Sequence, residues 1–235
     1  MEQVLHNFYT QNEMDRIWKE LEYLRSTDFG WRSPNPITNA VDEKTGITKF
    51  QGAKQFDFSL VFDKYQHHLA TSKSNIYSLG KKLLKWMDYL ENKHEIYFML
   101  KQINYHTAFV NYYNQDKSVY NSHKDLAVFT ILSYFYKKPK NFTGGDLLVE
   151  DRKYKISNGF TIILPSWMDH GTTPVTIKDK TKDDAGRYCI AHFYTVGVAR
   201  EGYNGIYSKI DYGVGDGYFK LTHELFDPTP IPVKE

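Results

Sequence analysis

Two histidines and an aspartate are spaced along this chain in a way that suits a metal site. His123 and Asp125 are two residues apart, and His170 follows 45 residues after Asp125. On a β-strand, residues i and i+2 point to the same face, so His123 and Asp125 can bind one ion together while a second strand supplies His170. Two imidazoles and one carboxylate that leave open positions suit a non-haem iron(II) that must bind O2 and a substrate.

The sequence around these residues places them at the ends of buried strands. The apolar run 126–132 follows the His-x-Asp pair directly, and His170 comes just after a second apolar run, residues 160–164. Rigid strand ends supply the fixed geometry that a metal site needs. A His-x-Asp triplet alone is a common coincidence in a chain with nine histidines, so the flanking strands carry the prediction.

Arg187 opens a further strand-like run and could bind an anion. Alternation along residues 187–195 puts Arg187, Cys189 and Thr195 on one face with two apolar side chains. A guanidinium at the end of such a face is costly unless an anion pairs with it, and its planar fork suits a carboxylate. An Asp or Glu of the protein, or solvent at the start of the strand, could also satisfy it.

The elements that would position these residues form a helical part followed by a strand-rich part. Residues 4–8 predict a short strand, and Thr10 with Glu13 predicts a capping box before a helix that ends near Thr27. A second helix is expected over residues 75–93. Strand-like runs follow at residues 96–102, 108–113, 127–136, 146–150, 159–165 and 188–196. This order predicts a mainly β fold with flanking helices, an antiparallel sandwich or jelly roll.

Composition bounds the class of protein. The 235 residues are 41% hydrophobic with a net charge of +2, which predicts one domain over residues 1–235. We expect helical support to about residue 95, the core to about residue 200, and then a C-terminal loop region that could act as a lid. No nucleic-acid or membrane partner is expected, because neither a strongly basic face nor a long apolar run is visible. One cysteine and no signal-like N-terminus favour a cytoplasmic or otherwise intracellular protein.

An ordered set of motifs around the predicted ligands resembles one known family. In chain order, its further pieces are Tyr113, Tyr134, Gly144-Gly145-Asp146-Leu147, Asn158-Gly159, Pro174-Val175 and Gly186-Arg187. The set is similar to that of the iron(II)/2-oxoglutarate-dependent dioxygenases, closest to their prolyl-4-hydroxylase-like branch. The resemblance is clearest over residues 110–196.

The resemblance implies a fold, a metal and a reaction. The fold would be a double-stranded β-helix, which is a jelly roll, with Fe(II) bound by His123, Asp125 and His170. The reaction would use O2 and 2-oxoglutarate to hydroxylate a C–H bond, with release of succinate and CO2 and with ascorbate as a reductant.

The resemblance also assigns contacts to 2-oxoglutarate. Its distal carboxylate would pair with Arg187 and accept a hydrogen bond from Tyr134. Tyr113 would make a further contact to the co-substrate. Thr195, on the same strand face as Arg187, could assist.

The substrate and two other classes of protein stay open. A peptidyl proline or another protein side chain is the first expectation by resemblance, with small molecules as the alternative, and loops at residues 31–52 and 201–219 would select it. The charged insert 178–186 departs from the family pattern and is expected to form an exposed hairpin tip. A cupin-like metalloenzyme that does not use 2-oxoglutarate is one alternative, and an iron-free jelly-roll binding module is the other.

Overall fold

Thr10 begins the first helix, α1 (Gln11–Ser26), through the predicted capping box. The Thr10 side chain accepts from the Glu13 backbone N–H, and the Glu13 carboxylate accepts from the Thr10 backbone N–H at 2.7 Å. The helix buries Ile17, Leu21 and Leu24 and ends at Thr27, as predicted. The structure is a computed structural model that describes residues 1–27, 31–32, 50–51, 54–57, 74–103, 105–182, 184–196 and 219–220.

Residues 75–91 are helical, as predicted, but in three joined pieces. These are α4 (Asn75–Leu79), the 3-10 helix η1 (Gly80–Trp86) and α5 (Met87–Glu91). The strand predicted over residues 96–102 is wrong, because a 3-10 helix, η2 (Glu95–Gln102), occupies this region. The His94 side chain accepts from the Ile96 backbone N–H at 3.1 Å and caps η2. The buried residues Tyr97 and Leu100 are three positions apart, which is the helical rather than the strand period.

One large antiparallel sheet contains the long strands. Its strands, in spatial order, are β1 (Gln3–Val4), β11 (Phe160–Pro165), β7 (Phe129–Phe135), β14 (Arg187–Thr195), β5 (Tyr105–Tyr113), β4 (Lys54–Asp57) and β2 (Trp31–Arg32). The short β15 (Phe219–Lys220) also pairs with β5. The four central strands match the runs predicted at residues 108–113, 127–136, 159–165 and 188–196, with bounds that differ by up to three residues.

Three small antiparallel sheets form a second layer. They are β10 (Arg152–Tyr154) with β9 (Leu147–Val149) and β12 (His170–Thr172), β13 (Val175–Ile177) with β8 (Phe142–Gly144), and β3 (Phe50–Gln51) with β6 (Val119–Tyr120). Single bridges join them, from Ser118 to Val175 and from His123 to His170. The insert predicted as an exposed tip forms a turn-rich, largely exposed connection between β13 and β14 in its described residues.

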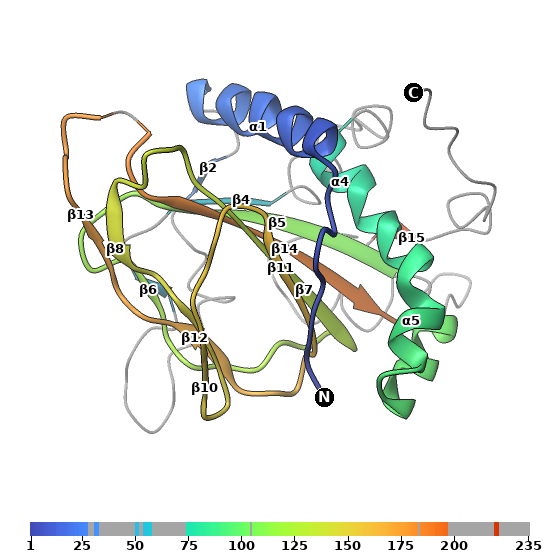
Figure 1. Ribbon diagram of the computed structural model, residues 1–235. Coiled ribbons are helices and arrows are strands. Elements are labelled where there is room, and N and C mark those ends of the chain that lie inside the picture. The colour runs from blue at the N-terminus through green and yellow to red at the C-terminus, as the bar shows by residue number, and fades with distance from the viewer. Residues whose placement is uncertain are drawn as a thin grey trace.

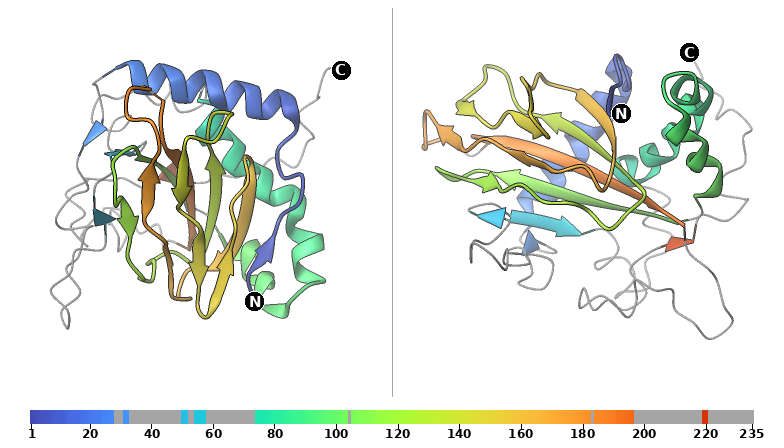
Figure 2. Two further views of the ribbon diagram at one scale, coloured as in Figure 1. Left: turned by 60° about the vertical axis from the view of Figure 1, so that its left-hand side comes forward. Right: turned by 90° about the horizontal axis from the view of Figure 1, so that it is seen from below.

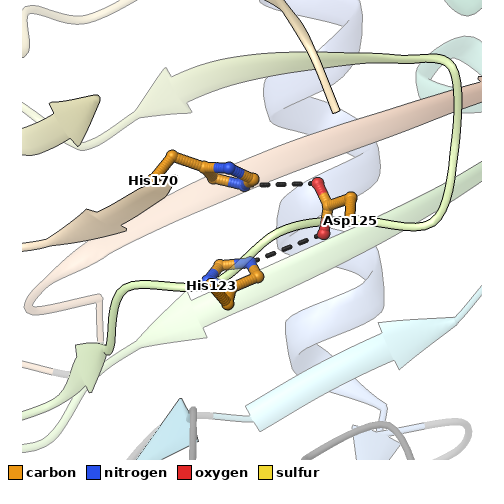
Figure 3. A group of neighbouring side chains, drawn as sticks. All are labelled: His123, Asp125 and His170. Atoms are coloured by element: carbon orange, nitrogen blue, oxygen red, sulfur yellow. Dashed lines mark ion pairs between the residues drawn. The ribbon is translucent and has the colours of Figure 1, made fainter. Parts of the chain in front are cut away.

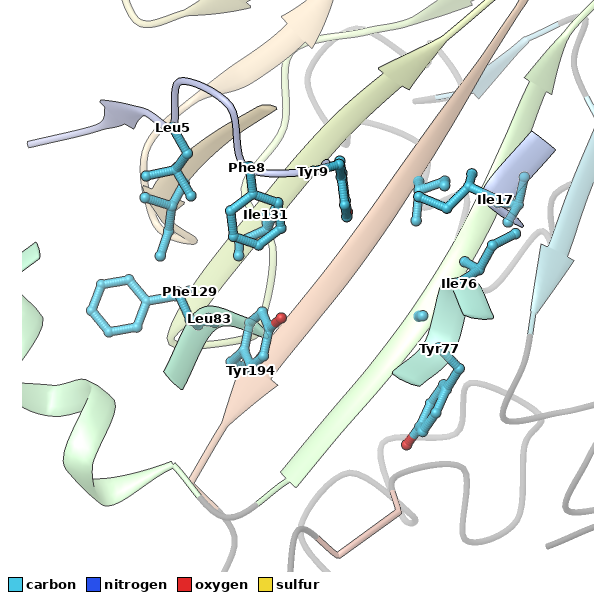
Figure 4. Packing of buried hydrophobic residues seen from close by; sticks show 14 of the residues in the cluster. Leu5, Phe8, Tyr9, Ile17, Ile76, Tyr77, Leu83, Phe129, Ile131 and Tyr194 are labelled. Atoms are coloured by element: carbon cyan, nitrogen blue, oxygen red, sulfur yellow. The ribbon is translucent and has the colours of Figure 1, made fainter. Parts of the chain in front are cut away.

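The large sheet has a core on each face. Helices α1, α4 and α5 lie against one face, and the small strands β8, β9, β10, β12 and β13 lie on the other (Figures 1 and 2). On the helical face, Phe8, Ile17 and Leu83 pack with Ile131 and Tyr194 of the sheet (Figure 4). The second core lies between the large sheet and the small strands. This confirms a mainly β architecture with flanking helices.

Some predictions fall outside the described residues. These include most of the loops at residues 31–52 and 201–219 and nearly all of the C-terminal region that could act as a lid. The expectation of a single domain stays a prediction. Within the part of the chain that the structure describes, no helix is long and apolar enough to cross a membrane.

Candidate metal centre

The side chains of His123, Asp125 and His170 converge between the two layers (Figure 3). Their candidate ligand atoms all lie within 4.8 Å of one another. The Asp125 carboxylate is 3.5 Å from His123 Nε2 through Oδ1 and 3.2 Å from His170 Nε2 through Oδ2. With side-chain exposures of 8% for His123, 13% for Asp125 and 3% for His170, the cluster is shielded from bulk water but still open. The predicted triad is therefore brought together.

The backbone holds the triad differently from the sequence prediction. His123 and His170 exchange two backbone hydrogen bonds of 2.9 Å, and the Asp125 N–H donates to the Ser166 carbonyl at 2.8 Å. The expectation that His123 and Asp125 lie on one strand is wrong, because the following strand, β7, begins only at Phe129. The reason is that this segment crosses from the small-strand layer, where His123 bridges β12, to the large sheet.

Backbone carbonyls set the orientation of both imidazoles. His123 Nδ1 lies 2.8 Å from the Asn121 carbonyl oxygen, and His170 Nδ1 lies 2.9 Å from that of Met168. A carbonyl can only accept, so each Nδ1 carries a proton and each Nε2 is the ring nitrogen directed toward Asp125. Outer hydrogen bonds of this kind fix the tautomer of metal-binding histidines.

Two hydroxyl groups support the Asp125 carboxylate. Thr130 Oγ1 donates to Asp125 Oδ2 at 2.7 Å and lies 2.8 Å from Ser166 Oγ. Sequence reasoning missed both residues. The signal for Thr130 was its position as a polar residue inside the apolar strand 129–135, whereas Ser166 reaches the site only through the fold.

The protonation states of the triad suit metal binding. Burial alone would raise the pKa of Asp125, but the charges and hydrogen bonds of His170 and His123 outweigh burial and hold this pKa well below its usual value. Burial, with the charge of His170, lowers the pKa of His123. Burial opposes protonation of His170 as well, but the Asp125 charge outweighs it and raises the His170 pKa. A metal ion would take over the role of that proton, because ligands bind metals in their deprotonated forms.

Tight packing keeps the His123 ring in place. The Tyr120 ring centroid lies 4.0 Å from that of His123, and the Tyr120 N–H donates to Thr172 Oγ1 at 2.9 Å. A Cβ atom on Gly171 would come within 2.8 Å of the Tyr120 carbonyl oxygen and 2.9 Å of the Ser122 nitrogen. Only glycine fits at this position without moving the backbone. Sequence reasoning did not single out these contacts, which join segments about 50 residues apart in the chain.

A cavity adjoins the triad. The rest of its lining is mostly apolar or aromatic and comes mainly from strands of the large sheet: Phe109, Asn111, Tyr113, Tyr120, Leu132, Tyr134, Leu147, Gly171, Thr172, Cys189, Ala191 and Phe193. Both predicted tyrosines, Tyr113 and Tyr134, are therefore in it. Burial raises the pKa of Cys189 to about 11, so this lining thiol is neutral.

Arg187 is fully buried behind this lining. Its guanidinium carbon lies 3.9 Å from the ring centroid of Tyr113 and 4.8 Å from that of Tyr134. None of its three side-chain nitrogens has a hydrogen-bond partner among the described residues. Gly145 leaves room for it, because a Cβ there would lie 2.7 Å from Arg187 Nε. Neither solvent nor an acidic side chain of the described residues pairs with this cation. Within the described residues, these two alternatives to a bound anion, which the sequence had left open for Arg187, are therefore wrong.

Thr195 is not brought to Arg187. The two residues share a face of β14 but lie at its opposite ends. Eight residues of extended strand separate them by about 26 Å. Thr195 is also not among the described residues that line the cavity.

No protein-family model and no curated protein matches the chain. Among solved structures, it is similar to prolyl 4-hydroxylases from Phytophthora capsici, with 13% identity, 91% of this chain and 66% of that chain covered, and a TM-score of 0.51. A Pseudomonas putida prolyl-4-hydroxylase shares 11% identity, with 83% of this chain and 92% of that chain covered and a TM-score of 0.46. A 2OG-Fe(II) oxygenase family oxidoreductase from Burkholderia pseudomallei shares 18% identity, with 38% of this chain and 41% of that chain covered and a TM-score of 0.30.

The similarity to the Phytophthora structure concerns the fold. It extends over most of this chain, although only about two thirds of the length of that protein is matched. The predicted double-stranded β-helix, or jelly roll, is thereby confirmed, and the His-Asp-His cluster is a candidate metal site within it.

Proposed function

We propose that this chain is an Fe(II)- and 2-oxoglutarate-dependent dioxygenase. It shares its fold with prolyl 4-hydroxylases over most of its length. It hydroxylates a substrate C–H bond and releases succinate and CO2. A peptidyl proline or another protein side chain is the first candidate substrate, and a small molecule is the alternative.

The donor set fits iron(II). His123 and His170 offer Nε2, and Asp125 offers a carboxylate oxygen, which together are the two-histidine, one-carboxylate set of non-haem iron oxygenases. Bound iron(II) supplies O2 activation coupled to oxidative decarboxylation of 2-oxoglutarate. The protein holds the three ligands in place through the His123–His170 backbone bridge and the Thr130 hydroxyl.

One observation carries the assignment of 2-oxoglutarate: Arg187 is a fully buried cation without a counter-ion among the described residues, beside the cavity of the metal triad. A buried charge is stable only when it is paired. The distal carboxylate of 2-oxoglutarate would supply the missing anion, and its keto-acid end would bind at the triad. Tyr113 and Tyr134, whose rings lie against Arg187, would be next to this carboxylate. A metalloenzyme without 2-oxoglutarate would leave Arg187 without a role.

The cavity lining keeps the reaction away from water. Leu132, Leu147 and Ala191 present apolar surface beside the ligands, and Phe109 packs edge-on against Phe193 with ring centroids 5.1 Å apart. Exclusion of water prevents side reactions of a reactive oxidant.

The test is succinate formation by the purified chain with Fe(II), 2-oxoglutarate, ascorbate and O2. We expect succinate above the background of reactions that lack iron or O2, and stimulation when a prolyl peptide or another true substrate is added. Absence of succinate from iron-loaded protein, with or without candidate substrates, would overturn the proposal. A cupin-like metalloenzyme would bind metal without making succinate, and an iron-free binding module would retain no metal.

A further inference from the structure

A second cavity, of about 440 Å³, shares no lining residue with the cavity beside the metal triad. It lies between the end of β5 with the turn that follows it, the end of β13, and the insert 178–186. Its described lining consists of Tyr112, Asn114, Gln115, Asp116, Ile177, Lys180, Lys182 and Ala185. This volume is in the range of small-molecule sites, which is about 300–1,000 Å³. The proposed dioxygenase reaction gives this cavity no role.

The insert is fastened to β5 and to the turn after it, so it forms a wall of the cavity. The Asp116 carboxylate accepts from the Ile177 backbone N–H at 2.8 Å and pairs with the ammonium group of Lys180. At the other end of the insert, the Tyr112 hydroxyl donates to the Ala185 carbonyl at 3.0 Å. These two attachments hold the insert on both sides of the cavity.

A third attachment fixes the insert between the first two. The Asn141 side chain donates to the Asp179 carbonyl at 2.9 Å and accepts from the Asp179 N–H at 3.1 Å. The Asp179 carboxylate in turn accepts from the Thr181 N–H at 3.0 Å and from the Thr181 hydroxyl at 2.6 Å. The backbone that carries Lys180 and Lys182 is therefore ordered by its own hydrogen bonds.

The charged side chains of the lining leave one lysine without a counter-ion. Lys180 is paired with Asp116, whereas no acidic side chain of the described residues forms an ion pair with Lys182. Asp179 is nearby, and hydrogen bonds from Thr181 with a smaller contribution from the charge of Lys182 lower its pKa. Because Thr181 already occupies that carboxylate, Lys182 remains open to an anion. An ammonium group is a compact charge with three donors, which suits phosphate.

Asn114 adds a hydrogen-bond acceptor to the same cavity. Its side-chain oxygen is buried and has no hydrogen-bond partner among the described residues. A buried acceptor without a partner is costly, and a ligand N–H or O–H would remove that cost. The cavity therefore offers a ligand one positive charge and one acceptor.

We propose that this cavity binds a small organic phosphate that also carries a hydrogen-bond donor. Lys182 pairs with the phosphate, and the Asn114 side chain accepts from an N–H or O–H of the rest of the ligand. Sugar phosphates and nucleoside monophosphates share this chemistry, so the probes must distinguish the two sources. The proposal does not depend on the dioxygenase activity, because the two cavities have separate linings.

Titration calorimetry of the full chain with ribose 5-phosphate, adenosine 5′-monophosphate, inorganic phosphate and ribose tests the proposal. We expect at least one of the two organic phosphates to bind with a Kd below about 1 mM, and the tighter of them identifies the source. Inorganic phosphate lacks the second part of the ligand and ribose lacks the charge, so both should bind at least about tenfold more weakly. Binding of neither organic phosphate, or of inorganic phosphate as tightly as the better organic one, would overturn the proposal.

Variants locate the binding. Lys182→Glu and Asn114→Leu should each weaken the better organic phosphate at least about tenfold. Lys85→Glu is the matched control, since Lys85 is an exposed lysine of η1 outside the cavity, and its Kd should not change. Arg187→Met should also bind as wild type does. Wild-type affinity in Lys182→Glu would overturn the proposal, and so would loss of binding in Arg187→Met, because the phosphate would then lie beside the metal triad.

Discussion

His123 and His170 face each other across a single antiparallel bridge, in which each residue donates its backbone N–H to the carbonyl of the other at 2.9 Å. Their ring centroids are 4.3 Å apart. Because this bridge is made by backbone atoms alone, the two imidazoles face each other before any metal binds. Asp125 joins them through its own backbone bond to Ser166. Such preorganisation lowers the cost of ordering the ligands when a metal enters.

Asp125→Ala should abolish iron binding and, with it, succinate production. Two imidazoles alone lose the negative ligand that balances the metal charge, so we expect metal affinity to fall about 100-fold or more. Metal content after dialysis and succinate yield measure the two effects. Asp169→Ala is the matched control, because that carboxylate is exposed and lies 3.5 Å from Lys124 instead. Full iron content and normal turnover in Asp125→Ala would remove this residue from the site.

Gly171→Ala should weaken metal binding without touching any ligand. The added Cβ would lie 2.8 Å from the Tyr120 carbonyl oxygen, so β12 must move away from the segment that leads to His123. Overpacking of this kind costs about 1–3 kcal/mol. Thermal unfolding and a Co(II) titration should both show the loss, whereas Thr143→Ala at an exposed position of β8 should change neither. Wild-type stability and wild-type Co(II) affinity in Gly171→Ala would contradict the prediction, because the backbone at β12 would then accommodate the added Cβ at no cost.

The sequence predicted which residues form the candidate site more reliably than it predicted the backbone conformation at those residues. Alternation along β14 placed Arg187 and Cys189 on the pocket face, because the strand is regular. The same alternation grouped Thr195 with them, because it predicts which face of a strand a side chain is on but not how far apart two residues lie along the strand. His123 and Asp125 reach one site although no strand contains both, which period-two reasoning does not anticipate. Contacts such as that of Thr130 with Asp125 depend on the crossing of two layers and have no local signature.

A buried histidine pair on the helical face of the sheet should make folding sensitive to acid. His106 Nε2 lies 2.8 Å from His192 Nδ1, and both side chains are buried beside Tyr77 and Tyr194, with Lys81 the nearby cation. Burial lowers the pKa of His192 to about 3, and burial with the charge of His192 lowers the pKa of His106 well below 6.5.

The sign follows from the unfolded chain, which takes up these protons near pH 6.5 while the folded protein does not. The stability due to the neutral His192 ring is complete above pH 6.5 and is lost as the pH falls toward about 3, at about 1.4 kcal/mol per pH unit. The lowered pKa of His106 acts in the same direction. Urea unfolding between pH 7.5 and 5 should therefore show a shallower pH dependence in His192→Gln than in wild type. His6→Gln, at an exposed position, should keep the wild-type slope. Identical slopes in His192→Gln and wild type would contradict the prediction.

Arg187→Met should stabilise the ligand-free protein while it destroys co-substrate binding. The substitution keeps an unbranched side chain but removes a buried charge that has no counter-ion among the described residues, and such changes are neutral or stabilising by about 1–4 kcal/mol. The KM for 2-oxoglutarate should rise at least about tenfold, because the distal carboxylate loses its partner. Arg152→Met provides the opposite case: Arg152 is half-exposed and pairs with the buried carboxylate of Glu2 at 2.5 Å. That variant should lose stability and keep its KM, so the two substitutions together separate a cation reserved for a ligand from one that holds the fold. Unchanged 2-oxoglutarate dependence in Arg187→Met would move the anchor of the co-substrate to another residue.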